Sequence, residues 1–140
     1  MSCLETYATL RIFSASMKPS EVSSVLCQQP TRQRAKEPDS KYKPRREVSY
    51  WSWCSKEQLQ STENLDHVQA IIDLLDGKSA ALEELRARKC EIDIFSFWVS
   101  SGQGGPHLTA PVLKKLAALE LEIGWDMYFE EYEESDEHGT

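Results

Sequence analysis

The sequence predicts one α+β domain with a ferredoxin-like arrangement, in which two βαβ units are joined by an extra helix. In this arrangement the helices pack on a four-stranded, mainly antiparallel sheet. Four segments have strand character, and those at 7–13 and 123–129 alternate two sets of residues with the period of two that is typical of strands. The segments between them carry apolar residues three and four positions apart, as amphipathic helices do. The strand at 91–99 is apolar on both faces, which places it in the middle of the sheet.

Length and charge restrict the classes of protein that the chain can belong to. At 140 residues it is long enough for one hydrophobic core and too short for two domains of ordinary size, so we expect a single domain over 1–140. Its formal net charge of -7 argues against general nucleic-acid binding, which requires cations that neutralise phosphates. The same charge favours a basic partner.

Cysteine spacing and hydropathy indicate the cellular compartment. The four cysteines lie far apart with no CxxC pair, so we expect neither a zinc site nor any other cofactor. The first residues lack the basic start and apolar run of a secretory signal, and no segment approaches the roughly 20 apolar residues of a membrane helix. We therefore expect a cytoplasmic protein with reduced thiols and no membrane contact.

The first half of the chain contains two predicted strands, at 7–13 and 48–55, and a helix that begins at Pro19 and ends before Pro30. Between them, residues 28–47 hold seven Lys or Arg, three acidic residues and three prolines, which predicts a long basic loop. This loop is either a solvated connection or a mobile arm that grips an acidic or phosphorylated partner. Trp51 and Trp53 share one face of the second strand and serve either core packing or an aromatic contact surface.

The second half contains a helix over 64–89 that Gly77 interrupts, and a third helix with Thr109 as its N-cap. His67 lies beside the apolar stripe without a second metal ligand at suitable spacing, so we interpret it as a surface or boundary histidine. In the last strand, at 123–129, alternation points one set of residues inward: Ile123, Trp125, Met127 and Phe129. We expect the acidic segment 130–140 to be frayed. The first and third strands are predicted to be central, and the second and fourth to be edges.

Two stretches offer candidate chemistry. The glycine-rich turn before the third helix matches neither a dinucleotide-binding loop nor a P-loop, but it is a candidate anion or small-ligand site formed by Gly102, Gly104, Gly105, His107 and Thr109. His107 could also serve a weak enzyme as a base, with Cys54 or Cys90 as nucleophile and Asp126 as the orienting carboxylate. Nothing in the sequence brings these groups together. A sheet that exposes Phe95 and Phe97 is typical of RNA binding, yet the RNP1 pattern is absent.

Three stretches in this order carry a resemblance to a family: PTRQRAKEPD, SYWSWCS and GPHLTAPVLKKLAALELEIGWDMYF. Together they resemble the bacterial domain-of-unknown-function family DUF4279, over residues 7–129. The resemblance implies a small cytoplasmic protein without an assigned reaction, and similar proteins are encountered among immunity proteins that neutralise secreted toxins. We therefore expect a non-enzymatic protein that binds and blocks a cognate toxin, with a small-ligand sensor as the alternative. The expected contact residues are Glu130, Glu131, Glu133, Glu134, Asp136, Phe95, Phe97 and Trp51. An edge strand could also support a weak homodimer.

Overall fold

The computed structural model describes residues 3–130 of the chain. The described residues form five strands, which are β1 (Cys3–Ser14), β2 (Arg32–Arg34), β3 (Ser49–Cys54), β4 (Glu91–Ser100) and β5 (Glu122–Phe129). They also form five α-helices, which are α1 (Pro19–Leu26), α2 (Lys43–Glu47), α3 (Asn64–Leu74), α4 (Ser79–Ala87) and α5 (Ala110–Ala118), and a short 3-10 helix, η1 (Ser55–Glu57). None of the described helices has the length and hydropathy needed to cross a membrane.

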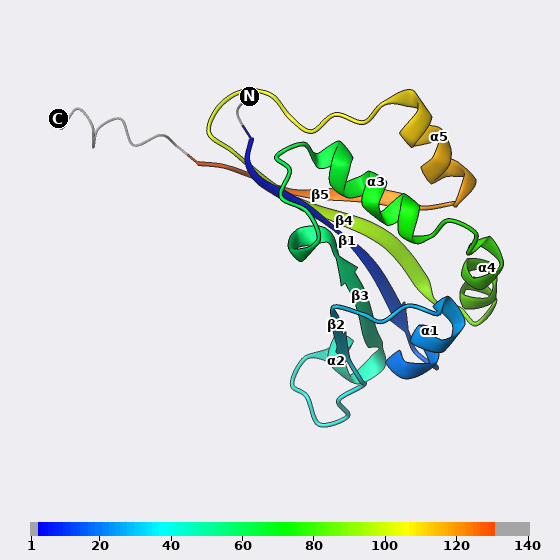
Figure 1. Ribbon diagram of the computed structural model, residues 1–140. Helices are drawn as coiled ribbons and strands as arrows, with labels where there is room; N and C mark the ends of the chain where they lie inside the picture. Colours follow the sequence, from blue (N-terminus) through cyan, green and yellow to red (C-terminus); the bar gives the residue numbers. More distant parts are fainter. Residues whose placement is uncertain (1–2, 131–140) are drawn as a thin grey trace.

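The five strands form one mixed sheet in the order β2-β3-β1-β4-β5 (Figure 1). β1 is antiparallel to both β3 and β4, whereas β4 and β5 are parallel. The crossover from β4 to β5 contains α5, so these elements form the second βαβ unit that the sequence predicts. β1 and β4 both lie inside the sheet, as predicted, and for β4 the prediction rested on the apolar character of residues 91–99. The prediction of a single α+β domain is confirmed.

The predicted four-stranded, ferredoxin-like arrangement is not confirmed. The first βαβ unit of that arrangement requires parallel strands, but β1 and β3 are antiparallel neighbours that pair directly, with Leu10 opposite Trp53. A fifth strand, β2, pairs with β3, so the strand predicted at 48–55 is not an edge. The edges of the sheet are β2 and β5.

The predicted basic loop at 28–47 contains both β2 and α2. Its own arginines hold it in place. Arg34 donates through Nη1 to the carbonyls of Ala35, Arg45 and Val48 at 3.3 to 3.4 Å. Arg46 likewise donates to the carbonyls of Ser40 and Lys41. Two of the cationic side chains of this segment, Arg34 and Arg46, are therefore engaged in local hydrogen bonds.

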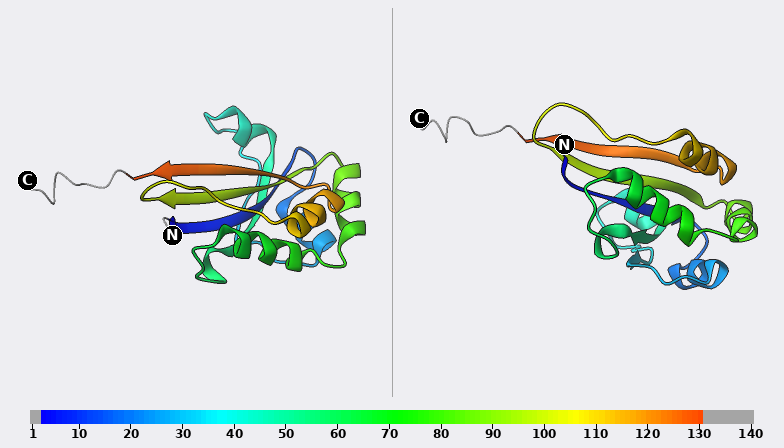
Figure 2. Two further views of the ribbon diagram at one scale, coloured as in Figure 1. Left: turned by 90° about the horizontal axis from the view of Figure 1, so that it is seen from above. Right: turned by 45° about the horizontal axis from the view of Figure 1, so that its top comes forward.

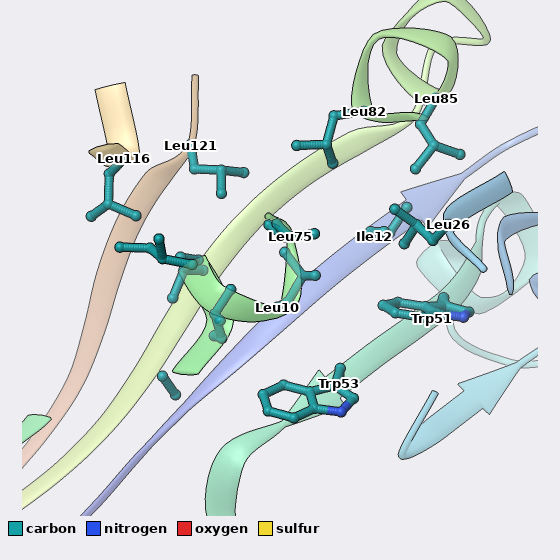
Figure 3. Close-up of a cluster of buried hydrophobic side chains, with 14 of the residues drawn as sticks. Leu10, Ile12, Leu26, Trp51, Trp53, Leu75, Leu82, Leu85, Leu116 and Leu121 are labelled. Atoms are coloured by element: carbon teal, nitrogen blue, oxygen red, sulfur yellow. The ribbon is translucent and has the colours of Figure 1, made fainter. Parts of the chain in front are cut away.

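Four of the helices, α1, α3, α4 and α5, pack on one face of the sheet and bury a single core, to which α2 contributes no residue (Figure 3). Even-numbered residues of β1 face this core, and Ala8, Leu10 and Ile12 are almost completely buried there. Trp51 and Trp53 from β3 lie in the same core, so packing explains the two tryptophans on one face. The break predicted at Gly77, which has a φ of +76°, separates α3 from α4.

The sequence analysis interpreted His67 as a surface or boundary histidine, but its side chain is buried and only 1% exposed. It lies in α3, next to the turn that follows β3. Its Nδ1 is 2.6 Å from Ser55 Oγ, and its Nε2 is 2.8 Å from the carbonyl oxygen of Ser61. Both ring nitrogens therefore have a hydrogen-bond partner, which offsets the cost of removing the imidazole from water.

The end of β5 also differs from the prediction. Met127 and Phe129 were expected to face the core, but they are 41% and 58% exposed. Alternation does place them on the helix side of the sheet, opposite Trp98 and Ser100 in the β4 register. However, the end of β5 extends past α3 and α5, as two views show (Figures 1 and 2). No helix is present there to cover these two side chains.

Candidate functional site

The face of the sheet opposite the helices is the candidate site, and we call it the open face. Odd-numbered residues of β1 and β4 point to this face, because side chains alternate along a strand. The open face carries six half-buried or exposed aromatic side chains from four strands, which are Tyr7, Phe13, Tyr50, Phe95, Phe97 and Tyr128. A sheet face with this many aromatic residues, which none of the core helices α1, α3, α4 and α5 covers, is a surface suited to contact with another molecule.

Three of these rings form a row across β1, β4 and β5, which we call the aromatic row. Tyr7 and Phe97 are stacked, with their centroids 4.9 Å apart and an interplanar angle of 19°. Tyr128 packs against the other side of Phe97 at a centroid distance of 5.6 Å. Cross-strand pairing puts Tyr7 directly opposite Phe97, so the register itself builds the row.

Arg11 forms a second, charged centre beside the aromatic row. Its guanidinium donates to both carboxylate oxygens of Asp93, at 2.8 and 2.7 Å. It also lies over the ring of Phe95 at 4.4 Å and that of Phe13 at 5.3 Å. The hydrogen bond to Asp93 raises the pKa of Arg11 despite its partial burial. The bidentate pair fixes a flat cation against two rings, an arrangement for which lysine could not substitute.

A shallow groove of about 520 Å³ crosses the open face. Charged side chains line both of its sides. Arg32, Lys56 and Glu57 line the side near β2 and η1, where Lys56 Nζ lies 5.2 Å from the ring centroid of Tyr7 and 3.7 Å from Glu5 Oε2. Asp126 from β5 lines the other side, and Asp93 neutralises the charge of Arg11 in between. The groove therefore presents an aromatic floor between a side of mixed charge and an acidic side.

Two tyrosines of the aromatic row have raised pKa values, for different reasons. Partial burial is the main cause of the raised pKa of Tyr7. For Tyr128, the main cause is the hydrogen bond that its hydroxyl donates to Asp126 Oδ2, at 3.1 Å. The neutral phenol is therefore favoured at both positions. For Tyr7, the contribution of this pKa shift to the free energy of unfolding is complete below about pH 10, and it is lost as the pH rises through the pKa of the folded state.

The substitution Asp126→Asn is expected to lower the pKa of Tyr128 towards the ordinary tyrosine value of about 10. The amide accepts a hydrogen bond but carries no charge, so it no longer opposes formation of the phenolate. The pKa of Tyr7 should fall less, because burial is its main cause. Ultraviolet titration of the tyrosines, with Tyr128→Phe to assign the signal, measures both shifts. Glu122→Gln is the control, and an equal shift in that variant would contradict the assignment.

The predicted contact residues are distributed unequally with respect to the open face. Phe95 and Phe97 lie on it, and Glu130 is exposed directly after β5. Trp51 is 1% exposed in the core, so it has no surface to offer a partner, and this part of the prediction is wrong. The remaining predicted contacts lie outside the described residues: Glu131, Glu133, Glu134 and Asp136.

The glycine-rich turn is separate from the open face. Gly104, Gly105 and His107 line a second cavity of about 490 Å³ on the helix side, together with Asn64 and Trp98. Gly102 and Thr109 do not line it, although the sequence analysis grouped them with the other three. Thr109 occupies the N-cap position of α5 but makes no side-chain capping hydrogen bond. Three of the five candidate residues are thus brought together.

The groups considered for an enzyme are not brought together. Cys54 and Asp126 line the groove of the open face, whereas His107 lines the cavity on the other side of the sheet. Cys90 is buried with its sulfur 3.5 Å from that of Met17, and burial raises the pKa of its thiol. Among residues 3–130 there is also no cluster of three or more His, Cys, Asp or Glu side chains that could hold a metal ion.

Sequence reasoning missed five residues of the open face, which are Tyr7, Arg11, Phe13, Tyr50 and Tyr128. The signal that could have found Tyr7 and Arg11 is present, since they alternate with the apolar residues of the first strand. Alternation separates the two faces of a strand, but it does not tell which face the helices leave uncovered.

A family model described as a domain of unknown function, DUF4279, matches residues 4–130. This range contains the whole sheet except Cys3, all five described helices and the open face. No curated protein and no solved structure matches the chain. Because the match covers nearly the whole chain, the protein belongs to the DUF4279 family.

Proposed function

We propose that this protein is a non-enzymatic binding protein that engages a protein partner through the open face of its sheet. The observation that carries the proposal is the aromatic row together with the stacked Arg11. Tyrosine and arginine are enriched among the residues that dominate binding energy, and aromatic rings lose little conformational entropy on contact. Stacking and the bidentate ion pair already fix these side chains before a partner arrives, which reduces the entropic cost of binding.

Charge favours a protein over a nucleic acid as the partner. A nucleic-acid platform combines aromatic rings with a groove that is positively charged throughout. Here Asp126 lines the groove on one side and Asp93 neutralises Arg11. The whole chain carries a formal net charge of -7. A surface with both signs of charge suits the polar rim of a protein interface.

We further propose that the partner is a bacterial toxin and that binding blocks its active site. This proposal is supported by the acidic balance of the chain, and it follows the expectation from the sequence resemblance that similar proteins occur among immunity proteins. A toxin with a basic surface would associate faster with an acidic inhibitor, since opposite charges steer the encounter. The cytoplasm is the compartment in which such protection is required, and we propose it as the location of this protein.

The substitution Phe97→Ala is expected to weaken partner binding about 30-fold, as truncation of a central interface aromatic costs about 2 kcal/mol or more. The experiment captures the partner from the host with tagged wild-type protein, identifies it by mass spectrometry and measures the dissociation constants with purified components. Leu113→Ala is the matched control, because Leu113 is 49% exposed on α5, on the helix side. Unfolding curves of both variants exclude loss of structure as the cause.

Expression of the captured partner then tests the toxin proposal. Wild-type protein and Leu113→Ala should restore growth of cells that express the partner, and Phe97→Ala should not. A partner that does not impair growth would refute the immunity proposal but leave the binding proposal standing. Equal affinities of Phe97→Ala and Leu113→Ala would refute the open face as the interface.

The cavity beside the glycine-rich turn supports a second candidate, a sensor for a small ligand or an anion. Its volume of about 490 Å³ lies within the range of about 300–1,000 Å³ typical of small-ligand sites. The substitution Gly105→Val should fold, since a Cβ at this position meets no atom within 4 Å. Thermal-shift measurements with inorganic phosphate, sulfate and carboxylates should detect stabilisation of the wild type that the variant loses. Equal stabilisation of both proteins would rule this cavity out.

A further inference from the structure

We propose that the outer edge of β5 receives an extended, basic segment of a partner protein, which pairs with β5 as an additional strand. The inference rests on the proposed function and deepens it, since it names the part of the partner that this side of the open face recognises. It follows from the length of the edge, from its row of acidic side chains and from the apolar residues at its end.

The two edges of the sheet differ in their capacity to accept a strand. β2 has only three residues and is followed within the same segment by α2, so it offers little backbone for pairing. β5 has eight residues and, within the described part of the chain, pairs with β4 alone. It is the outermost of the three long strands (Figure 2, left). A long edge that is neither bulged nor capped by proline presents free backbone donors and acceptors to another extended chain.

Acidic side chains line this edge at every fourth residue. Glu122 and Asp126 point to the open face, because positions four apart lie on the same side of a strand, and Glu130 directly follows β5, with its backbone N–H donating to the carbonyl of Ser100 at 2.9 Å. None of the three forms an ion pair within residues 3–130, and Asp126 only accepts a hydrogen bond from Tyr128. A segment with Lys or Arg at alternate positions would place its charges next to this row.

The same acidic row disfavours a second copy of the chain as the added strand. In an antiparallel pair of β5 strands centred on Asp126, that residue would face its own copy, and Glu122 would face Glu130. Like charges directly opposite each other destabilise a strand pair. The homodimer through an edge strand that the sequence analysis considered is therefore less favourable at β5 than pairing with a basic segment.

The residues at the end of β5 define the other side of the added strand. Met127 and Phe129 are exposed on the helix side, while Tyr128 extends the aromatic row to the edge on the open face. A partner segment that alternates basic and apolar residues would place its apolar side chains next to Met127 and Phe129. Its basic side chains would then lie over the acidic row and the ring of Tyr128, where cation–π contact adds to the ion pairs.

The test uses the purified full chain and a synthetic nine-residue peptide that alternates lysine with valine. Strand addition creates backbone hydrogen bonds, so hydrogen exchange of amides in β5 should slow about tenfold or more when the peptide is present at saturation. The double substitution E122K/E130K should weaken peptide binding about tenfold, because it reverses two exposed charges of the row. D76K/E83K is the matched control, since it changes the net charge equally at exposed positions of the helix side.

Two further peptides separate strand addition from charge attraction alone. A peptide with glutamate in place of lysine should not bind. A lysine peptide with N-methylated amides on the side that faces β5 keeps its charges but cannot pair, so it should give no protection from exchange. Equal binding of the methylated and unmethylated peptides would overturn the inference, as would equal weakening by E122K/E130K and D76K/E83K. If binding of a captured partner requires Phe97 but not Glu122 and Glu130, the proposed function is supported and strand addition at β5 is refuted.

Discussion

Replacement of Trp51 by alanine is expected to lower the free energy of unfolding by about 3–5 kcal/mol. Trp51 is 1% exposed and is among the largest fully buried side chains of the core. Its indole Nε1 donates to Ser23 Oγ in α1 at 2.9 Å, so the ring joins the first helix to β3. Alanine would leave a large cavity between these elements and a part-buried serine hydroxyl without its donor.

Urea unfolding of the wild type and two variants measures this loss. Tyr42→Ala is the control for removal of an aromatic ring, because Tyr42 is 66% exposed, and it should change the stability by less than about 0.5 kcal/mol. Trp51→Phe keeps most of the apolar volume and loses the hydrogen bond, so its stability should lie between those of the wild type and Trp51→Ala. A loss below about 1 kcal/mol for Trp51→Ala would mean that the core closes around the missing ring.

The strands that the sequence predicts are those with a clear pattern of residues. β1, β3 and β5 place residues of different character on their two faces, β4 is apolar on both, and all four lie close to their predicted positions. Their order in the sheet was not predictable in the same way. Pairing of β1 directly with β3 depends on contacts such as Leu10 with Trp53, which are 43 positions apart in the sequence and leave no periodic signal.

β2 shows the limit of local patterns. Its three residues, Arg32, Gln33 and Arg34, have neither alternation nor β-branched side chains. Tertiary hydrogen bonds hold the strand instead. Thr31 donates its backbone N–H to the carbonyl of Ser52 at 2.8 Å, and its hydroxyl accepts from the N–H of Cys54 at 3.0 Å. A segment whose strand structure depends on hydrogen bonds to another strand has the residue pattern of a loop.

The open face could be predicted only in part. Phe95 and Phe97 were recognised as possible surface aromatics, because they share one face of the central strand. Recognition of the complete surface also requires the register that places Tyr7 opposite Phe97, and the packing of the helices on the other face. These two facts belong to the assembled sheet and not to any one strand.

The substitution His67→Ala is expected to destabilise the fold by about 2–4 kcal/mol, although a lone histidine beside a helical stripe suggested a surface position. Ser55 Oγ accepts the backbone N–H of Ala8 at 2.9 Å, so its own hydrogen is directed to His67 Nδ1. Nε2 then carries the ring proton and donates to the carbonyl of Ser61. The imidazole thus links α3 to β1 and to the segments around η1, and alanine would leave a cavity and a buried hydroxyl without its acceptor.

Thermal and urea unfolding of three variants separates the two contributions. His107→Ala removes an exposed imidazole and should change the stability by less than about 0.5 kcal/mol. His67→Gln can restore a donor near Ser61 and fills part of the volume, so it should recover part of the loss. Equal stabilities of His67→Ala and His107→Ala would show that the hydrogen bonds of His67 make no net contribution to the free energy of unfolding. Recovery by His67→Leu but not by His67→Gln would attribute the whole effect to packing, because leucine fills the space without replacing either hydrogen bond.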